Sequence, residues 1–239
     1  MHKIRLPHWA HERGRSLNAL DALAPRRTVL VVVDMQRAFI AEGEVFGNAH
    51  ARDVIDPVNR LVAAARGAAV PVVWTRQTFV GAGAAAAPPW QYDPSDAFVR
   101  RATAALTAGA PSHAIHPAMA VGADDLVIDK TRYGAFSCPR GELPAALGRL
   151  DAEMLVICGT LTNCCCDSTA REANMAGYKV IVAADACAAV TDAEHNAALL
   201  NLRIMFADVK RARQIEGMFA RLPRAPGLNP PGLGALAEA

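Results

Sequence analysis

The chain has 239 residues, 52% of them hydrophobic and 20% charged. This is enough for one sizeable core and predicts a single domain over residues 1–239. Its 25 lysines and arginines nearly balance 23 aspartates and glutamates, and no long run of one sign occurs, which argues against nucleic acid or an anionic membrane surface as a main partner.

Six cysteines in a chain of this length are too sparse for a secreted disulfide framework, and three of them are neighbours in the sequence. Adjacent cysteines rarely meet the geometry of a disulfide bond. The sequence also lacks an apolar leader and any run of 18 apolar residues. We therefore expect a reduced, cytoplasmic protein without a membrane partner.

The chain order predicts an arm, then alternating strands and helices, then a tail. Residues 1–27 carry Pro7 and Pro25 and show little periodicity, so we expect an arm that lies on the domain or on a neighbouring subunit. Four prolines predict a loose tail at 222–239. The elements predicted between them are strand 28–33, helix 53–66, strand 70–74, helix 95–106, strand 125–129, helix 143–150, strand 155–158, a helix through 175, strand 179–183 and helix 191–206.

This alternation predicts an α/β fold, a three-layer Rossmann-like arrangement of a mostly parallel sheet with helices on both faces. In such sheets, sites form beyond the carboxyl ends of the strands. The rule selects three places on one edge: Asp34 after the first strand, Lys130 after the third, and the turn after the fourth. The Gly-, Ala- and Pro-rich segment 76–93 is predicted to be an active-site loop.

The turn at 159–166 leads from a strand into a helix and carries three consecutive cysteines. The first N–H groups of a helix have no partner in the helix, and its dipole favours negative charge there. A cysteine in this position is therefore expected to have a lowered pKa and a larger thiolate fraction. Periodicity alone does not show which of Cys164, Cys165 and Cys166 is the reactive one.

The two other strand-end residues have structural alternatives. Asp34 emerges from an apolar run and could act in catalysis, or it could cap a helix; Gln36 could orient it or hydrogen-bond a loop. Lys130 is one of four lysines in a chain that otherwise uses arginine. A site that needs a compact ammonium with an adjustable pKa would explain it, and so would a simple pairing with Asp129.

No cofactor or metal is predicted from the residues. The first helix lacks a Gly-x-Gly-x-x-Gly opening and the chain lacks a P-loop, so a dinucleotide or ATP is not expected. Adjacent cysteine side chains diverge and no Cys-x-x-Cys spacing occurs, which disfavours a zinc site.

Three separated runs, at 29–36, 129–136 and 159–171, agree in their order with one known family. Together they resemble the isochorismatase-like cysteine hydrolase superfamily over about residues 28–208. Its motif Gly-x-x-Thr-Asn-x-Cys-x-x-Ser-Thr-x-Arg falls on 159–171 and implies that Cys165 is the nucleophile. The family's aspartate and lysine fall on Asp34 and Lys130.

The resemblance implies hydrolysis of a C–N bond in a small molecule through a thioester on Cys165. Asp34 would take the thiol proton and pass it to the leaving nitrogen, while Lys130 would favour the thiolate. The resemblance also implies an oxyanion site at the backbone N–H groups of Leu161 and Cys165, and a cis peptide bond at Thr160–Leu161. Relatives form dimers or tetramers, so a homodimer or homotetramer is expected.

Within this family the chain is most similar to the ureido-, biuret- and carbamoyl-amide hydrolases, judged from the segment 130–136. The nicotinamidase branch binds a metal through Asp-x-His after the second strand, and residues 75–78 of this chain read Thr-Arg-Gln-Thr, so no metal is implied. Beyond the triad, the residues predicted to bind oxyanion or substrate are Thr160, Leu161, Gln36, Arg76, Gln77, Tyr133 and Phe136.

Two other hypotheses stay open. One is hydrolysis of a different small carbonyl compound or a vinyl ether on the same scaffold. The other is a non-catalytic, redox-responsive protein in which the cysteine cluster is oxidised or buried. The presence of both Asp34 and Lys130 at strand ends favours an enzyme, and the substrate itself is not identified by the sequence.

Overall fold

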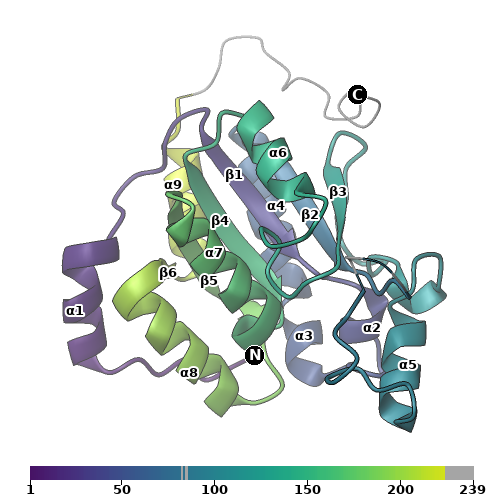
Figure 1. Cartoon of the computed structure of the whole chain (residues 1–239). Helices are drawn as coiled ribbons and strands as arrows, with labels where there is room; N and C mark the ends of the chain where they lie inside the picture. Colours follow the sequence, from purple (N-terminus) through teal and green to yellow (C-terminus); the bar gives the residue numbers. More distant parts are fainter. Residues whose placement is uncertain (82, 84–85, 224–239) are drawn as a thin grey trace.

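The computed structural model describes residues 1–81, 83 and 86–223, so the predicted tail lies outside the described residues from 224 onward. Its centre is a six-stranded sheet in which every pair of neighbouring strands is parallel, in the order β3-β2-β1-β4-β5-β6 (Figure 1). The strands are β1 (Thr28–Val33), β2 (Val72–Gln77), β3 (Leu126–Lys130), β4 (Met154–Thr160), β5 (Lys179–Ala188) and β6 (Asp208–Lys210).

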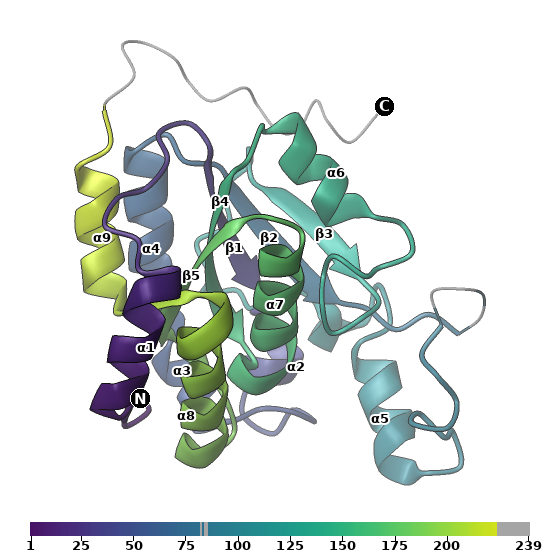
Figure 2. The ribbon, with the colours of Figure 1, turned by 60° about the vertical axis from the view of Figure 1, so that its left-hand side comes forward.

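Helices cover both faces of this sheet, which confirms the predicted three-layer α/β class. In the two ribbon views, α4 and α9 lie on one face and α6 and α7 on the other (Figures 1 and 2). Shorter helices lie beyond the carboxyl ends of β1, β2 and β3, at the edge where sites are expected (Figure 1). The helices are α1 (His8–Asn18), α2 (Arg37–Ile40), α3 (Ala49–Asp53), α4 (Ile55–Gly67), α5 (Ala97–Ala105), α6 (Glu142–Arg149), α7 (Asp167–Met175), α8 (Asp192–Asn201) and α9 (Ala212–Ala220).

The central strand β1 has the bounds predicted from its continuous apolar run. All six of its residues are buried, because β2 and β4 flank it and helices cover both faces. Residues Thr28 to Val33 pair in register with Met154 to Gly159. This pairing brings the ends of β1 and β4 to the same level, so the residues that follow them meet.

The second strand differs from its prediction, because it covers 72–77 and not 70–74. The sequence rule ended it at Trp74, where the apolar run gives way to polar residues. Thr75 and Gln77 are nevertheless buried within the strand, since their side chains hydrogen-bond to Asp34 and Lys130 on the neighbouring strands. Polar residues can continue a buried strand when their side chains form hydrogen bonds with other buried polar groups.

The N-terminal arm contains a helix that was not predicted. α1 packs against the segment Leu202–Phe206, which follows α8. There Asn18 Nδ2 donates to the Arg203 carbonyl at 3.0 Å. Gly14 is essential to this contact, because a Cβ atom there would lie 2.2 Å from the Arg203 carbonyl oxygen. Tertiary packing, more than the weak sequence pattern of the arm, thus forms this helix. β6 and α9 were also not predicted.

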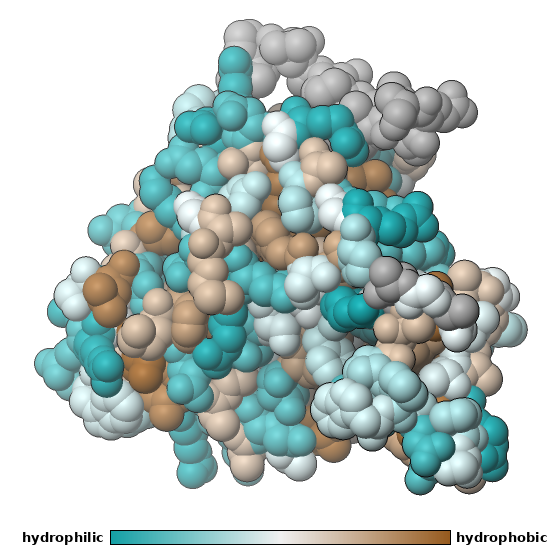
Figure 3. Space-filling view, viewed as in Figure 1, coloured by the Kyte–Doolittle hydropathy of each residue, from teal (hydrophilic) through white to brown (hydrophobic). Residues whose placement is uncertain are grey.

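The surface carries no dominant hydrophobic area on the face drawn in Figure 3, where hydrophobic residues form scattered groups among hydrophilic ones across the coloured residues. Among the described residues, no helix combines the length and the apolar character needed to cross a membrane.

The close approach of the end of β4 to the end of β1 requires a glycine at position 159, which can be tested. The φ of Gly159 is +117°, and a Cβ atom would lie 2.1 Å from the Val33 carbonyl oxygen. We expect Gly159→Ala to lower the free energy of unfolding by about 2 kcal/mol or more, measured by urea titration. The matched control is Gly148→Ala in α6, where a Cβ meets no atom within 4 Å. This control should gain about 0.5–1 kcal/mol. Equal effects of the two changes would contradict the assigned backbone.

Candidate active site

Three side chains that the sequence selected meet at the carboxyl edge of the sheet. Asp34 follows β1, Lys130 ends β3, and Cys165 lies in a π-helical turn, Thr162–Cys166, between β4 and α7. The Lys130 Nζ lies 2.8 Å from the Asp34 Oδ2, and both side chains have no exposed surface. Cys165 lies near enough to the Lys130 ammonium to help raise the pKa of that lysine. The structure thus brings the three predicted residues together.

The Asp34 carboxylate is aimed by both neighbouring strands. Its backbone adopts a left-handed φ of +47°, which turns the chain sharply at the end of β1. Thr75 Oγ1 donates to Asp34 Oδ1 at 2.7 Å from β2, and Thr160 Oγ1 donates to the Asp34 carbonyl at 2.7 Å from β4. These bonds stabilise a backbone conformation that is unfavourable for a residue other than glycine.

Lys130 is held as a cation although it is fully buried. Burial alone would lower its pKa, but the Asp34 carboxylate and the Cys165 sulfur outweigh burial and raise the pKa of Lys130 above its ordinary value. Its other hydrogen bonds go to Gln77 Oε1 at 2.6 Å and to the Arg132 carbonyl at 3.0 Å. Two hydrogen bonds and one ion pair thus compensate the buried ammonium.

The surroundings of Cys165 favour its protonated form, opposite to the lowered pKa expected for a cysteine at the start of a helix. Its hydrogen bond with Cys164, its burial and the nearby Asp34 carboxylate raise the pKa of Cys165 well above the ordinary value, and Lys130 acts in the opposite direction. Asp34 Oδ2 touches Lys130 Nζ but accepts no aligned hydrogen bond within the described part of the chain. That oxygen retains a lone pair for the thiol proton, so Asp34 can act as a base.

The structure separates the three adjacent cysteines. Cys166 is fully buried and packs toward Cys187, and burial and this neighbour raise the pKa of its thiol. Cys164 is half-buried, and its hydrogen bond with Cys165 lowers the pKa of Cys164. Cys164 and Cys165 are thus a coupled pair. The ammonium of Lys130 favours ionisation of both thiols, so the assignment of Cys165 as the nucleophile stays a prediction from the family motif.

Beside this thiol lies a cavity of about 400 Å³. Four of the predicted binding or catalytic residues line it, namely Gln77, Tyr133, Leu161 and Cys165. The peptide bond between Thr160 and Leu161 is cis. The oxyanion role of the Leu161 and Cys165 N–H groups stays a prediction. The residues that line the cavity are Phe39, Phe46, Gln77, Phe79, Gln91, Tyr92, Phe98, Val99, Ala102, Leu106, Tyr133, Leu161, Cys164 and Cys165.

Comparison with known proteins decides the family. The isochorismatase domain matches residues 28–214, which covers β1 to α9 and all three site residues. The chain belongs to the isochorismatase family. It is 33% identical over 220 residues to the ureidoacrylate amidohydrolase RutB of Methylobacterium radiotolerans, an alignment that covers 86% of this chain and 84% of RutB.

Solved structures agree with this assignment. A cysteine hydrolase from Pseudomonas syringae pv. phaseolicola superposes with a TM-score of 0.74 and 27% identity, over 83% of this chain and 94% of that one. N-carbamoylsarcosine amidase from Thermoplasma acidophilum shares the fold, with a TM-score of 0.62 and 24% identity over 78% and 96% of the two chains. This chain is therefore an isochorismatase-family hydrolase.

In this isochorismatase-family chain, four predicted substrate contacts lie outside the described wall of the cavity: Gln36, Arg76, Thr160 and Phe136. The Gln36 carboxamide donates to the carbonyls of Gln77 and His113, at 3.1 and 2.8 Å, and accepts the Gln77 N–H at 2.7 Å. It is fully buried and joins β1 to β2 and to the 113 segment.

Arg76 and Phe136 also have structural partners in place of a substrate. The Arg76 guanidinium forms two hydrogen bonds with the Asp129 carboxylate, at 2.6 and 3.0 Å, on the neighbouring strand β3. The Phe136 ring packs against Tyr178 with ring centroids 5.6 Å apart. Alternating side chains of a strand point to opposite faces, which is why Arg76 faces away while Gln77 reaches the cavity.

The aromatic wall was missed by the sequence analysis. Phe39, Phe46, Phe79 and Phe98 come from segments that follow β1 and β2, including α2 and α5. A signal was available, since four of the seven phenylalanines lie in these two segments. Thr75 was likewise missed as the partner of Asp34. A polar residue within a buried strand indicates that a hydrogen-bond partner exists, but the sequence does not show which residue that partner is.

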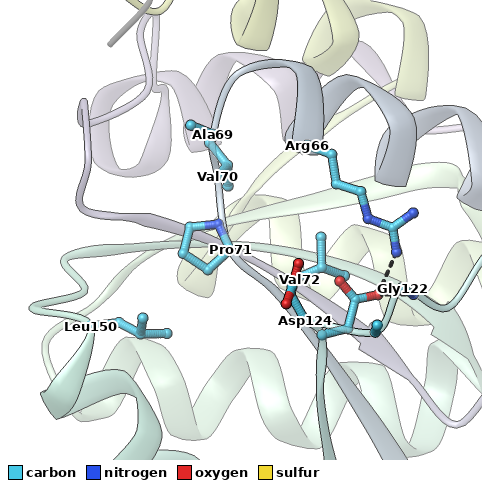
Figure 4. A pocket seen from close by; sticks show the side chains of 10 residues that line it. Arg66, Ala69, Val70, Pro71, Val72, Gly122, Asp124 and Leu150 are labelled. Atoms are coloured by element: carbon cyan, nitrogen blue, oxygen red, sulfur yellow. Dashed lines mark hydrogen bonds and ion pairs between the residues drawn. The ribbon is translucent and has the colours of Figure 1, made fainter. Parts of the chain in front are cut away.

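A second hollow, of about 360 Å³, lies at the opposite edge of the sheet, where β2 and β3 begin (Figure 4). Two of its charged groups, Arg66 and Asp125, already have partners. The Arg66 guanidinium donates to Asp125, whose carboxylate also accepts from Trp74 Nε1 at 2.7 Å and from the Gly122 N–H at 2.8 Å. This hollow is a structural junction without the groups that the chemistry needs.

One cluster has the spacing of a metal site. His2, His50 and Asp192 place ligand atoms within 4.8 Å of one another. The His2 ring is already committed, because its Nε2 accepts the Ala189 N–H at 3.0 Å. Its Nδ1 then carries the proton and donates to Asp192 at 2.8 Å. A protonated ring nitrogen has no lone pair for a cation, so these residues do not fit a metal as they are arranged.

The buried ion pair makes a prediction about stability. Lys130→Met would leave the Asp34 carboxylate buried without its cation, and we expect a loss of about 3–5 kcal/mol in the free energy of unfolding. The double variant Asp34→Asn/Lys130→Met should recover part of that loss, because no charge is then left alone. Urea unfolding of the unchanged protein, the single variants Lys130→Met and Asp34→Asn, and the double variant measures this coupling. Strict additivity of the two single changes would contradict it.

His195 makes a prediction about pH. It is fully buried, stacks on His2 and contacts Thr162 Oγ1 through its Nδ1 at 2.8 Å. Burial and His2 lower the pKa of His195 to about 3 from the ordinary 6.5, while Asp192 acts in the opposite direction. Below about pH 6.5 the unfolded chain binds a proton that the folded chain does not, so stability should fall as the pH drops from 6.5 toward 3.

In His195→Gln, the part of the loss in unfolding free energy that arises from His195 should be absent. Urea unfolding at pH 7 and pH 5 measures this loss. The exposed His8→Gln on α1 is the matched control. If His195→Gln keeps the slope of the unchanged protein, the buried neutral state assigned to His195 is wrong.

Proposed function

We propose that this isochorismatase-family hydrolase cleaves a C–N bond of a small amide or ureido compound through a thioester on Cys165. The observation that carries the proposal is the buried Asp34–Lys130 pair beside a thiol at the wall of a cavity. A nucleophile, a base and a cation within one dry site are the groups that acyl transfer needs.

In the first step Asp34 Oδ2 takes the proton of the Cys165 thiol, and the thiolate attacks the substrate carbonyl. The Lys130 ammonium stabilises the thiolate while the proton resides on Asp34. The negative charge that develops on the carbonyl oxygen would be bound by backbone N–H groups at Leu161 and Cys165. Collapse of the tetrahedral intermediate breaks the C–N bond, and Asp34 returns its proton to the leaving nitrogen.

In the second step water attacks the thioester. Asp34, again ionised, takes a proton from that water, and the C–S bond breaks to release the carboxylic or carbamic acid. The proton on Asp34 then returns to the Cys165 sulfur. Both half-reactions use one base in opposite directions, which fits a carboxylate whose remaining contacts, from Thr75 and Lys130, do not change.

The relatives support an amide substrate and do not decide it. RutB of Methylobacterium radiotolerans is named a ureidoacrylate amidohydrolase. Cleavage of a vinyl ether would require a proton delivered to carbon and no nucleophilic thiol. It would leave the contact between Lys130 and Cys165 without a purpose.

The proposal predicts a different result for each cysteine. Cys165→Ala and Cys165→Ser should lose turnover by a factor of about 10³ or more, because the nucleophile is absent or too weakly acidic for Asp34. Cys164→Ala should retain a substantial part, since the family motif puts the nucleophile on Cys165 and not on Cys164. Ammonia release from a panel of small amides and ureido acids measures turnover, and acid-quenched intact mass detects an acyl adduct. An active Cys165→Ala enzyme would refute the mechanism.

A further inference from the structure

Resting on this proposed function, we infer that the acyl group of the substrate is apolar and uncharged, of the size of an aromatic ring or a short hydrocarbon chain. The cavity beside Cys165 is the place where the acyl group must lie while sulfur attacks its carbonyl carbon. The chemistry of its wall therefore selects the substrate class.

Six of the fourteen described residues that line this cavity are aromatic. Phe39 and Phe46 stack with ring centroids 5.3 Å apart, and Phe46 meets the edge of Phe98 at 5.8 Å. Phe79 packs edge-on against Tyr92 at 4.9 Å. Val99, Ala102 and Leu106 of the α5 segment complete the apolar surface. Such a wall gains free energy from burying hydrocarbon and offers preferred geometries to a ring.

No charged side chain lines this cavity among the residues that the structure describes. Of the cations around the site, Lys130 is already matched by Asp34 and Arg76 by Asp129. A substrate carboxylate placed here would lose its hydration and find no opposite charge, which is costly. The site thus disfavours a second negative charge on the acyl group.

The polar groups of the wall are few and mostly engaged with one another. Gln77 Oε1 accepts from Lys130, Gln91 Nε2 donates to the Tyr133 hydroxyl at 3.3 Å, and the Tyr92 and Tyr133 hydroxyls hydrogen-bond to each other. Burial, together with the hydrogen bond to Tyr133 for Tyr92, raises the pKa of both phenols. Both phenols are therefore neutral and supply no positive charge to a substrate carboxylate.

Phe98 indicates which part of the cavity a ligand covers. It is 48% exposed on α5, although its ring contacts Phe46, which stacks on the buried Phe39. An apolar acyl group in the cavity would remove this ring from water. Because Phe98 stands at the exposed side, its replacement changes the cavity with little disturbance of the core.

Arg132 allows a test of the opposite hypothesis, that the substrate carries a carboxylate. Arg132 lines a neighbouring hollow of about 150 Å³, where its guanidinium donates to the Thr131 carbonyl at 2.9 Å. If the enzyme does take an acid, this residue is the candidate to bind its carboxylate. Arg132 therefore belongs in the experiment.

The decisive comparison uses two amides of equal length, hexanamide and adipamic acid, which differ only in a terminal methyl or carboxylate group. We expect kcat/KM for hexanamide to exceed that for adipamic acid by at least roughly tenfold, and benzamide to be accepted as well. An equal or reversed preference would overturn the inference. If the enzyme prefers adipamic acid and Arg132→Gln abolishes that preference, Arg132 binds the carboxylate of the acid.

A matched pair of variants tests the wall itself. Phe98→Lys places a cation at the rim and should shift the ratio of the two kcat/KM values toward adipamic acid by roughly tenfold. Leu17→Lys also replaces an exposed apolar side chain, on α1 and away from the cavity, and should leave the ratio unchanged. Circular dichroism checks the fold of both. A ratio that does not move in a folded Phe98→Lys protein contradicts the assigned wall.

A binding measurement separates this inference from the proposed function. Ligand-observed NMR with Cys165→Ala should detect benzamide and hexanamide, but not adipamic acid, at equal concentrations. If this binding is found while no amide is hydrolysed, the chemistry fails and the cavity assignment stands. If ureido acids give an acyl adduct on Cys165 while neither neutral amide binds, the chemistry stands and the inference fails.

Discussion

The arrangement of the whole site depends on one ion pair that has no contact with water. Two charges buried at 2.8 Å are stable only when each also has hydrogen bonds, because the loss of hydration costs several kcal/mol per ion. Thr75 supplies such a bond to Asp34, and Gln77 with the Arg132 carbonyl supplies them to Lys130. Thr75 and Gln77, the polar residues near the end of β2, therefore stabilise the ion pair between Asp34 and Lys130 at the ends of the neighbouring strands.

Parallel pairing turns this local requirement into a property of the fold. β3, β2, β1 and β4 lie side by side, so the residues at their carboxyl ends arrive at one edge in a fixed order. The sharp turn at Asp34 and the close approach of Gly159 to Val33 then bring the Cys165 turn over that edge. Small errors in strand register would separate the thiol from its base.

The sequence allowed the position of the chemistry to be predicted better than its surroundings. Continuous apolar runs located β1, and the strand-end rule with the family motifs selected Asp34, Lys130 and Cys165. The same approach failed for Gln36 and Arg76, because a side chain's partner depends on the strand beside it. The aromatic wall was missed since it comes from short segments such as α2 and α5, which tertiary packing positions.

The origin of that wall has a consequence for directed evolution. The reacting groups sit at the ends of sheet strands, whereas Phe46, Phe79 and Phe98 come from segments outside the sheet. Libraries confined to these segments can sample new selectivities while the strands keep their pairing and the ion pair keeps its partners. Half-exposed Phe98 is the position at which such a library loses least thermal stability. Recombining loop segments between relatives of this fold should therefore exchange substrate preference without rebuilding the nucleophile.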